Sequence, residues 1–498
     1  MSETDPALRL GPVIGGLGPN GARLWGRAGG PGRLHAWVGR ESDLRDASLL
    51  GISLPLVEEW GFSGVVPLVS LEPDTRYYYS LTLSDTHPDP GPAPYPNFQT
   101  APEPGTRTPF GLAFGSCFLP EDRMGGGIFR QIEARRDSES LRFLMMLGDQ
   151  IYAEADARNG IGKIAVSLDE YRAIYEYNWS RPPLQSLLAN LPAFLVMDDH
   201  EVDNDWYWRN FEKTQARIPW FDRLLRRLMG KPLEERSLSP ARVASALQAY
   251  WENQAMHAPI PADRLDGLVE QFSTPSAGSV AAEEENGPDN SLRHLQAGDW
   301  GPFYYDFVFG GAAFFVFDLR SQRVRSGAAR QLLGEEQWQA FESWLQEVKQ
   351  EYPLKFLVTS SSLFFDMWVD VARDRWNGFP EERDRLFRLL SEAEVEGAYI
   401  LTGDLHSSHA IHAAIRTESG NPLPVWEFCA SPFEQSHSIL ARYTYHPVKS
   451  EWLVEQHLDF RAAEYCFGVV DIDFPVDEDY RVKFKVYGEQ GNLMAQAG

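Results

Sequence analysis

Short runs of apolar residues, each followed at once by polar residues, recur through most of this chain. Continuous apolar runs of this length are typical of strands that are buried on both faces of a sheet, as in α/β proteins. The pattern therefore predicts an α/β fold for the region that contains them. The six runs are Phe110–Gly115, Phe143–Leu147, Phe194–Met197, Ala312–Phe317, Leu354–Val358 and Ala398–Leu401.

The polar residues that follow these runs belong to an unusual set of types. They include Cys117, Asp149 after Gly148, Asp198-Asp199-His200, and Asp404 with His406. Function in α/β folds collects at the carboxyl ends of the strands. Any buried strand must end in something polar, which would explain one or two of these cases. It explains poorly a cysteine, several aspartates and two histidines at matching positions, so we expect a functional site at this edge.

The first part of the chain has a different pattern and predicts a separate domain. The full length of 498 residues exceeds what one core usually supports. Residues 1–102 form short alternating runs between Gly- and Pro-rich turns, which favours an N-terminal β-sandwich domain. Within it, Leu71–Tyr79 is similar to the tyrosine corner of a fibronectin-III-type sandwich. Residues 103–498 are expected to form the second domain, with a mostly helical insertion over residues 206–300.

Composition excludes several classes of function. The chain has 46 Lys and Arg against 71 Asp and Glu, a net charge of −25, which argues against a nucleic-acid scaffold or a binder of anionic membranes. Its three cysteines cannot form a disulfide framework, and its first residues carry no signal-peptide pattern. No apolar run reaches the roughly 18 residues of a membrane span. We therefore expect a cytoplasmic protein.

The residue types at the strand ends are those that hold metal ions. Thiolate, phenolate and imidazole ligands suit a transition ion such as iron, whereas carboxylates suit a hard ion such as Ca²⁺, Mg²⁺ or Mn²⁺. Two metals about 3.5–4 Å apart provide the nucleophile and the positive charge that phosphate ester hydrolysis needs. Taken singly, each candidate has a structural explanation; jointly they indicate a metal centre. We expect one site of Cys117, Asp149, Tyr152 and His406, and a harder site that includes the bridging Asp149, Asp199 and Asp404.

Four motifs contain these residues: Phe114-Gly-Ser-Cys117, Gly148-Asp-Gln-Ile-Tyr152, Asp198-Asp-His-Glu-Val-Asp-Asn204 and Gly403-Asp-Leu-His406. Together they resemble the motifs of the alkaline phosphatase D family, a branch of the calcineurin-like metallophosphoesterases. The resemblance implies an N-terminal β-sandwich followed by a metallophosphoesterase α/β/β/α sandwich. It also implies an Fe³⁺ and Ca²⁺ centre, with Mn, Zn or Mg as possible substitutes. The implied activity is hydrolysis of small-molecule phosphate mono- or diesters by a metal-bound hydroxide.

The resemblance implies a role for each of these site residues. Cys117, Asp149, Tyr152 and His406 carry over to the iron, Asp149 also as the bridge, and Asp199 and Asp404 carry over to the second metal. His200 carries over as the catalytic group that stabilises the phosphoryl oxygens or protonates the leaving group. Arg320 is a further candidate for neutralising developing charge, but it could equally form an internal ion pair. Related phosphoesterases often supply another ligand histidine before the last motif, where this chain has Thr359–Leu363 without one.

Two alternatives stay open at this point. One is a dedicated phosphodiesterase or phospholipid-cleaving enzyme, in which residues 206–300 narrow the access to the site. The other is a non-catalytic binding protein on the same scaffold. An eroded ligand set would favour the second alternative, yet the main ligand types are all present. The relative turnover of mono- and diesters tests the first alternative, and metal analysis tests the second.

Overall fold

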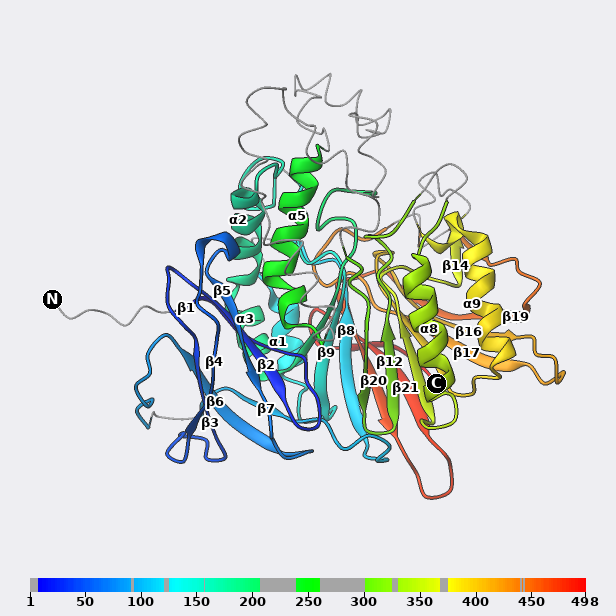
Figure 1. The fold of residues 1–498 in the computed structure, drawn as a ribbon. Helices are drawn as coiled ribbons and strands as arrows, with labels where there is room; N and C mark the ends of the chain where they lie inside the picture. The colour runs from blue at the N-terminus through cyan, green and yellow to red at the C-terminus, as the bar shows by residue number, and fades with distance from the viewer. Residues whose placement is uncertain are drawn as a thin grey trace.

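The computed structural model describes residues 8–90, 94–120, 125–155, 157–206, 239–259, 301–324, 330–367, 375–438, 441 and 444–498. Two large sheets pack face to face in this part of the chain, with helices on their outer faces (Figure 1). A smaller all-β unit, drawn in blue, lies beside them. Each of the six apolar runs predicted to be strands lies within a strand of the two large sheets, except that Met197 and Phe317 each follow the last residue of their strand.

The first large sheet has six strands in the order β10-β9-β8-β20-β21-β22. β8, β9 and β10 are parallel, and the last three strands are antiparallel to their neighbours. This parallel half carries the first three predicted runs. The strands are β8 Phe110–Gly115, β9 Leu141–Leu147, β10 Ala193–Val196, β20 Cys466–Asp473, β21 Arg481–Gly488 and β22 Leu493–Ala497.

The second large sheet has seven strands in the order β11-β12-β13-β15-β17-β16-β19. Its four central strands, from β12 to β17, are parallel. β11 is antiparallel to β12, β16 is antiparallel to β17, and β19 is antiparallel to β16. The strands are β11 Tyr305–Phe309, β12 Ala312–Val316, β13 Leu354–Val358, β15 Ala398–Thr402, β17 Leu423–Cys429, β16 Ser408–Ile415 and β19 Leu453–Ala462. A separate two-stranded sheet pairs β14 Phe365–Met367 with β18 Tyr445–Pro447.

Aromatic side chains fill the space between the two large sheets. Phe110 of β8 lies 4.6 Å from Phe309 of β11, and Phe143 of β9 lies 5.7 Å from Phe314 of β12, measured between ring centroids. Helices cover the outer faces, so the central strands are buried on both sides. This double burial explains why the strands read as continuous apolar runs instead of alternating ones.

The helices are divided between the two outer faces (Figure 1). α1 Gly127–Glu133, α2 Leu168–Trp179, α3 Pro182–Asn190 and α5 Pro240–Asn253 belong to the side of the six-stranded sheet. α8 Glu335–Val348 and α9 Pro380–Glu392 cover the seven-stranded sheet. In α8, the rings of Phe341 and Trp344 lie 5.2 and 5.5 Å from that of Phe315 in β12, measured between ring centroids. The described ranges also contain the short 3₁₀ helices η1 Glu58–Trp60, η4 Ala255–His257 and η6 Trp376–Gly378.

The N-terminal part is built from strands, as predicted. β1 Leu8–Gly15, β2 Ala22–Ala28 and β5 Ser63–Leu68 form one sheet; β4 Ser48–Ile52, β3 His35–Gly39, β6 Arg76–Thr82 and β7 Asn97–Gln99 form another. The Tyr77 hydroxyl accepts a hydrogen bond of 2.9 Å from the backbone N–H of Glu72, the kind of contact expected of a tyrosine corner. The fibronectin-III-type assignment and the division at residue 102 stay predictions.

The predicted insertion over residues 206–300 is described only at residues 206 and 239–259, which contain α5 and η4. The remainder of that prediction lies outside the described residues. None of the helices in the described ranges combines the length and the apolar character that crossing a membrane requires.

Candidate functional site: a metal centre at the strand ends

The predicted ligands come together where β8, β9, β10 and β15 end. Cys117 lies just beyond β8, Asp149 just beyond β9, and Asp404 just beyond β15. Among the described residues, three groups of side chains have ligand atoms within 4.8 Å of one another. The groups are Cys117, Asp149 and His406; Asp149, Asp199 and His200; and Asp149, Asp198 and Asp404. Asp149 belongs to all three, which is the position that a bridging carboxylate would occupy.

Four of these residues have left-handed backbone conformations. The φ angle is 63° at Cys117, 58° at Asp149, 64° at Asp404 and 50° at His406. For a residue with a side chain this conformation costs roughly 1–2 kcal/mol, so it persists only where the surroundings enforce it. Each loop turns sharply as it leaves its strand, and the four side chains converge.

Two glycines permit the loops to approach one another. A Cβ atom on Gly148, whose φ is 94°, would lie 2.5 Å from Cβ of Asp198. A Cβ atom on Gly403 would lie 2.5 Å from Oγ of Ser116. In each Gly-Asp pair, at 148–149 and at 403–404, the glycine allows the close approach of a neighbouring loop, and the aspartate that follows is a candidate ligand.

One half of the site contains the sulfur, phenol and imidazole groups. Sγ of Cys117 lies 3.3 Å from Oδ2 of Asp149, and the Tyr152 hydroxyl lies 3.4 Å from the same oxygen and 3.1 Å from Nε2 of His406. Nδ1 of His406 lies 2.6 Å from the backbone oxygen of Ser436, to which it donates, so Nε2 is left as the acceptor. The structure therefore brings together all four residues predicted for the first metal.

The other half of the site contains the aspartates. Asp199 and Asp404, predicted for the second metal, both lie near Asp149, but in separate groups: Asp199 with His200, and Asp404 with Asp198. From the sequence, Asp199 and not the adjacent Asp198 was assigned to the second metal. A shift of one residue after a strand reverses the direction of a side chain, so the pattern could not decide which of two adjacent aspartates points inward.

The electrostatics of the site favour a cation. Burial raises the pKa of Asp149 well above its usual range, and it raises the pKa of Cys117 to about 12, with Asp404 adding to that effect. Burial also raises the pKa of Tyr152. Oδ1 of Asp149 is buried and has no hydrogen-bond partner among the described residues. Burial thus disfavours the ionised form of several acidic groups that surround one point. A multivalent cation bound at that point would stabilise their ionised forms.

His200 is held in a different electrostatic environment. Its Nδ1 atom lies 2.5 Å from a carboxylate oxygen of Glu154, and its ring lies over Tyr152 with centroids 4.1 Å apart. Burial lowers the pKa of His200, but Glu154, Asp149 and Asp199 outweigh it, so that the pKa lies well above its usual range. A protonated imidazole at the metal centre can donate to an anionic substrate. His406, by contrast, has its pKa lowered to about 4, by burial first and then by His200.

Sequence reasoning missed three residues that support the site. Glu201 is fully buried and accepts hydrogen bonds from the backbone N–H groups of Asp149 (3.2 Å), Gln150 (2.7 Å) and Asp198 (3.0 Å). Glu154 contacts His200, and Arg375 forms an ion pair with Asp404. Glu201 stands within the motif that begins at Asp198, and this position was the one available signal for it.

Arg320 lies in the interior of the molecule. Its guanidinium forms ion pairs with Asp198 and with Asp199, the latter at 3.4 Å, and its side chain is 1% exposed. This geometry matches the internal ion pair considered from the sequence. The loop that replaces the additional histidine contributes Ser360, whose hydroxyl donates to Asp198 at 3.0 Å.

Comparisons with known proteins agree with this architecture. Residues 112–484 match the PhoD-like phosphatase family. Alkaline phosphatase D from Bacillus subtilis is 26% identical over 372 residues, a match that spans 68% of this chain and 52% of that protein. The chain therefore corresponds to about half the length of this curated relative.

Two solved structures share the fold. A structure of PhoD matches with a TM-score of 0.63 and 20% identity, covering 100% of this chain and 94% of that one. A purple acid phosphatase from yellow lupin seeds matches with a TM-score of 0.58 and 12% identity, covering 97% of this chain and 73% of that one. At these identities the likeness concerns the fold.

Proposed function

Because this chain belongs to the PhoD-like phosphatase family, we propose that it is a metal-dependent hydrolase of small phosphate mono- or diesters. The observation that carries the proposal is the convergence of ligand atoms from four separate strand ends on Asp149. A binding protein of the same fold would have no need to keep a thiol, a phenol, an imidazole and several carboxylates around one point.

We propose that Cys117, Asp149, Tyr152 and His406 hold Fe³⁺, and that Asp149 with Asp199 and Asp404 holds Ca²⁺. The three groups of ligand atoms that share Asp149, together with its buried Oδ1 atom, support this assignment. Mn, Zn or Mg could replace either ion. When bound, such a pair of ions supplies a nucleophile near neutral pH and positive charge for the phosphoryl oxygens.

The protein's own groups would orient the substrate and balance its charge. His200, held by Glu154, is placed to donate a proton or a hydrogen bond to the phosphoryl group or to the leaving oxygen. Arg320 would act by fixing Asp198 and Asp199, because its guanidinium forms ion pairs with both carboxylates. Its sequence-based assignment as a group that neutralises the substrate directly stays a prediction.

We also propose that residues 1–102 form a fibronectin-III-like domain and that residues 103–498 form a metallophosphoesterase α/β/β/α sandwich. Among the described residues, the strands between Leu8 and Gln99 pair only with one another. β7 ends at Gln99 and β8 begins at Phe110, so the proposed division falls in the connecting segment.

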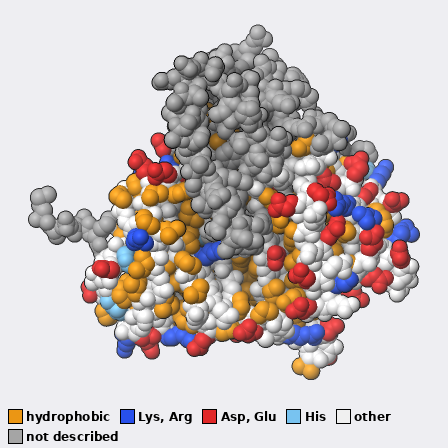
Figure 2. All heavy atoms as spheres, in the orientation of Figure 1, with side chains coloured by type: hydrophobic (Ala, Val, Ile, Leu, Met, Phe, Trp, Pro, Cys, Tyr) orange, Lys and Arg blue, Asp and Glu red, His pale blue; other side chains and the backbone are white. Residues whose placement is uncertain are grey.

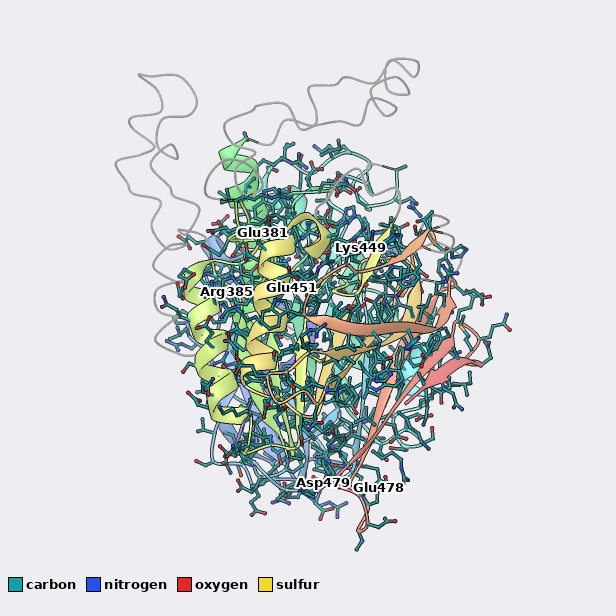
Figure 3. The ribbon with its side chains drawn as sticks, turned by 90° about the vertical axis from the view of Figure 1, so that its right-hand side faces the viewer. Glu381, Arg385, Lys449, Glu451, Glu478 and Asp479 are labelled. Carbon is teal, nitrogen blue, oxygen red and sulfur yellow. The ribbon has the colours of Figure 1, made fainter. Side chains whose placement is uncertain are left out.

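The test of function replaces Asp149 by Asn and measures bound metal and turnover of a chromogenic phosphodiester. We expect loss of both, because the bridging position would lose its charge. Asp479→Asn is the matched control, since Asp479 is an 80% exposed carboxylate in the β20–β21 loop, at the other end of the strands (Figure 3). Full turnover with metal retained in Asp149→Asn would reject the proposal.

A further inference from the structure

Three arginines line one hollow of 270 Å³ between the N-terminal strands and the six-stranded sheet. Arg76 is the first residue of β6, Arg136 follows α1, and Arg142 is in β9. Among the described residues that line this arginine hollow, Asp137 supplies the single carboxylate. The hollow is thus rich in cationic groups from both parts of the molecule.

Two of these arginines also connect the two parts. Arg142 donates to Oδ1 of Asp74 at 2.7 Å and to the backbone oxygen of Thr100 at 2.9 Å. Arg136 donates to Oδ1 of Asn97 at 2.8 Å. These contacts satisfy only part of the donor capacity of the two guanidiniums, since each has five N–H groups.

The remaining donor capacity faces few acidic partners. Nε of Arg142 is buried without a hydrogen-bond partner in the described part of the chain. Within the same ranges, neither Arg76 nor Arg136 forms an ion pair, although the chain has 71 acidic residues. On the face that Figure 2 shows, basic side chains are interspersed with acidic ones.

The three charges are close enough to affect one another. Burial is the main cause that lowers the pKa of Arg136 and of Arg142, and the charge of Arg76 lowers both further. Like charges that converge in a protein of net charge −25 carry an electrostatic cost that a bound anion would remove.

We propose that the arginine hollow binds a phosphate-type oxyanion, either inorganic phosphate or the phosphoryl group of a small organic molecule. Guanidinium groups match the oxygens of phosphate through paired N–H donors, and three of them around one hollow suit a dianion. The site differs from the metal centre: Arg142 and Asp149 are seven residues apart along and just beyond one strand, a separation of about 23 Å.

Equilibrium dialysis of the metal-loaded protein against radiolabelled inorganic phosphate tests the proposal. We compare the wild type, the R76Q/R136Q variant and the control R385Q. Arg385 lies on α9, which covers the seven-stranded sheet (Figure 3). If phosphate also binds at the metal centre, we expect two phosphates per chain in the wild type and the control, and one in the double variant. If the metal centre binds no phosphate, we expect one phosphate per chain in the wild type and the control, and none in the double variant.

Equal counts in the wild type and the double variant would overturn the proposal, whatever happens at the metal centre. Should R76Q/R136Q fail to fold, the single variant R76Q serves, because Arg76 is exposed. We expect R76Q to weaken binding at the hollow by about tenfold or more, as for the loss of a hydrogen bond to a charged group, and unchanged affinity would contradict the proposal.

Competition with phenylphosphonate, which is not hydrolysed, distinguishes inorganic phosphate from an organic phosphate as the ligand. Displacement from the hollow indicates an organic phosphate site, and its absence indicates a site for the inorganic ion.

Discussion

The two halves of the metal centre hold their ligands by different means. On the cysteine side (Cys117, Tyr152 and His406), neutral groups position the ligands beside Asp149, which both halves share. Hydroxyl groups of Ser116 and Ser431 lie 3.1 and 3.4 Å from Sγ of Cys117, and a backbone oxygen fixes His406. On the carboxylate side (Asp198, Asp199 and Asp404), each aspartate forms an ion pair with an arginine.

This difference follows from the charge of the ligands. A thiol and a phenol can be neutral in a buried site, so neutral hydrogen bonds suffice to position them. Ionised carboxylates in the same surroundings need positive charge, and Arg320 and Arg375 provide it. The carboxylate side is therefore organised by charge balance, whereas the cysteine side is organised by packing and hydrogen bonds.

The largest effect is expected where a buried arginine balances two carboxylates. Arg320→Met would leave Asp198 and Asp199 buried without their partner and lower the free energy of unfolding by about 3–5 kcal/mol. Arg385→Met is the control, since its ion pairs with Glu335 and Glu342 are partly exposed and worth about 0–1 kcal/mol. Urea unfolding of the chelator-treated proteins measures both. Similar small losses in the two variants would mean that the carboxylate side does not depend on charge balance.

The cysteine side is tested by removing one of its ligand atoms. Tyr152→Phe keeps the ring that lies over His200 but removes the oxygen 3.1 Å from His406. If the first metal is Fe³⁺, visible absorption from phenolate-to-iron charge transfer should be present in the wild type and absent in this variant. Metal affinity on this side should fall by more than about 100-fold, because loss of a ligand weakens metal binding more than loss of a group that supports a ligand. Asp199→Asn, on the other side, should retain the absorption; a band that survives in Tyr152→Phe would contradict the assignment.

Glu201 is expected to support both halves at once. Its carboxylate accepts from the backbone N–H groups of Asp149 and Asp198, which belong to the loops after β9 and β10. Glu201→Gln substitutes a donor for one acceptor oxygen, and we expect metal affinity to fall by about 10–100-fold at both sites. Metal titration followed by elemental analysis measures each ion. A loss confined to one ion would assign Glu201 to that half alone.

The sequence predicted the strands that carry the site and the positions of its ligands, because burial on both faces restricts a strand to apolar residues. Strands buried on both faces read as apolar runs, and the ligands stand just beyond their ends. It could not predict contacts that depend on loop conformation or on residues far apart in the chain. Examples are the left-handed conformation of Asp404, the ion pair between Arg375 and Asp404, and the identity of Asp198 as an ion-pair partner of Arg320. The choice between Asp198 and Asp199 depended on a one-residue shift that periodicity does not resolve.

The smallest effect is expected at Arg375, which balances charge on the rim of the carboxylate side. Its side chain is 17% exposed, so water screens part of its interaction with Asp404. Arg375→Gln should change the affinity for the second metal by about fivefold, the equivalent of roughly 1 kcal/mol. The direction is an increase, because the cation would no longer compete with the guanidinium for Asp404. A decrease in calcium affinity, measured by titration, would show instead that Arg375 positions Asp404 for the metal, and the two arginines of this side would then act alike.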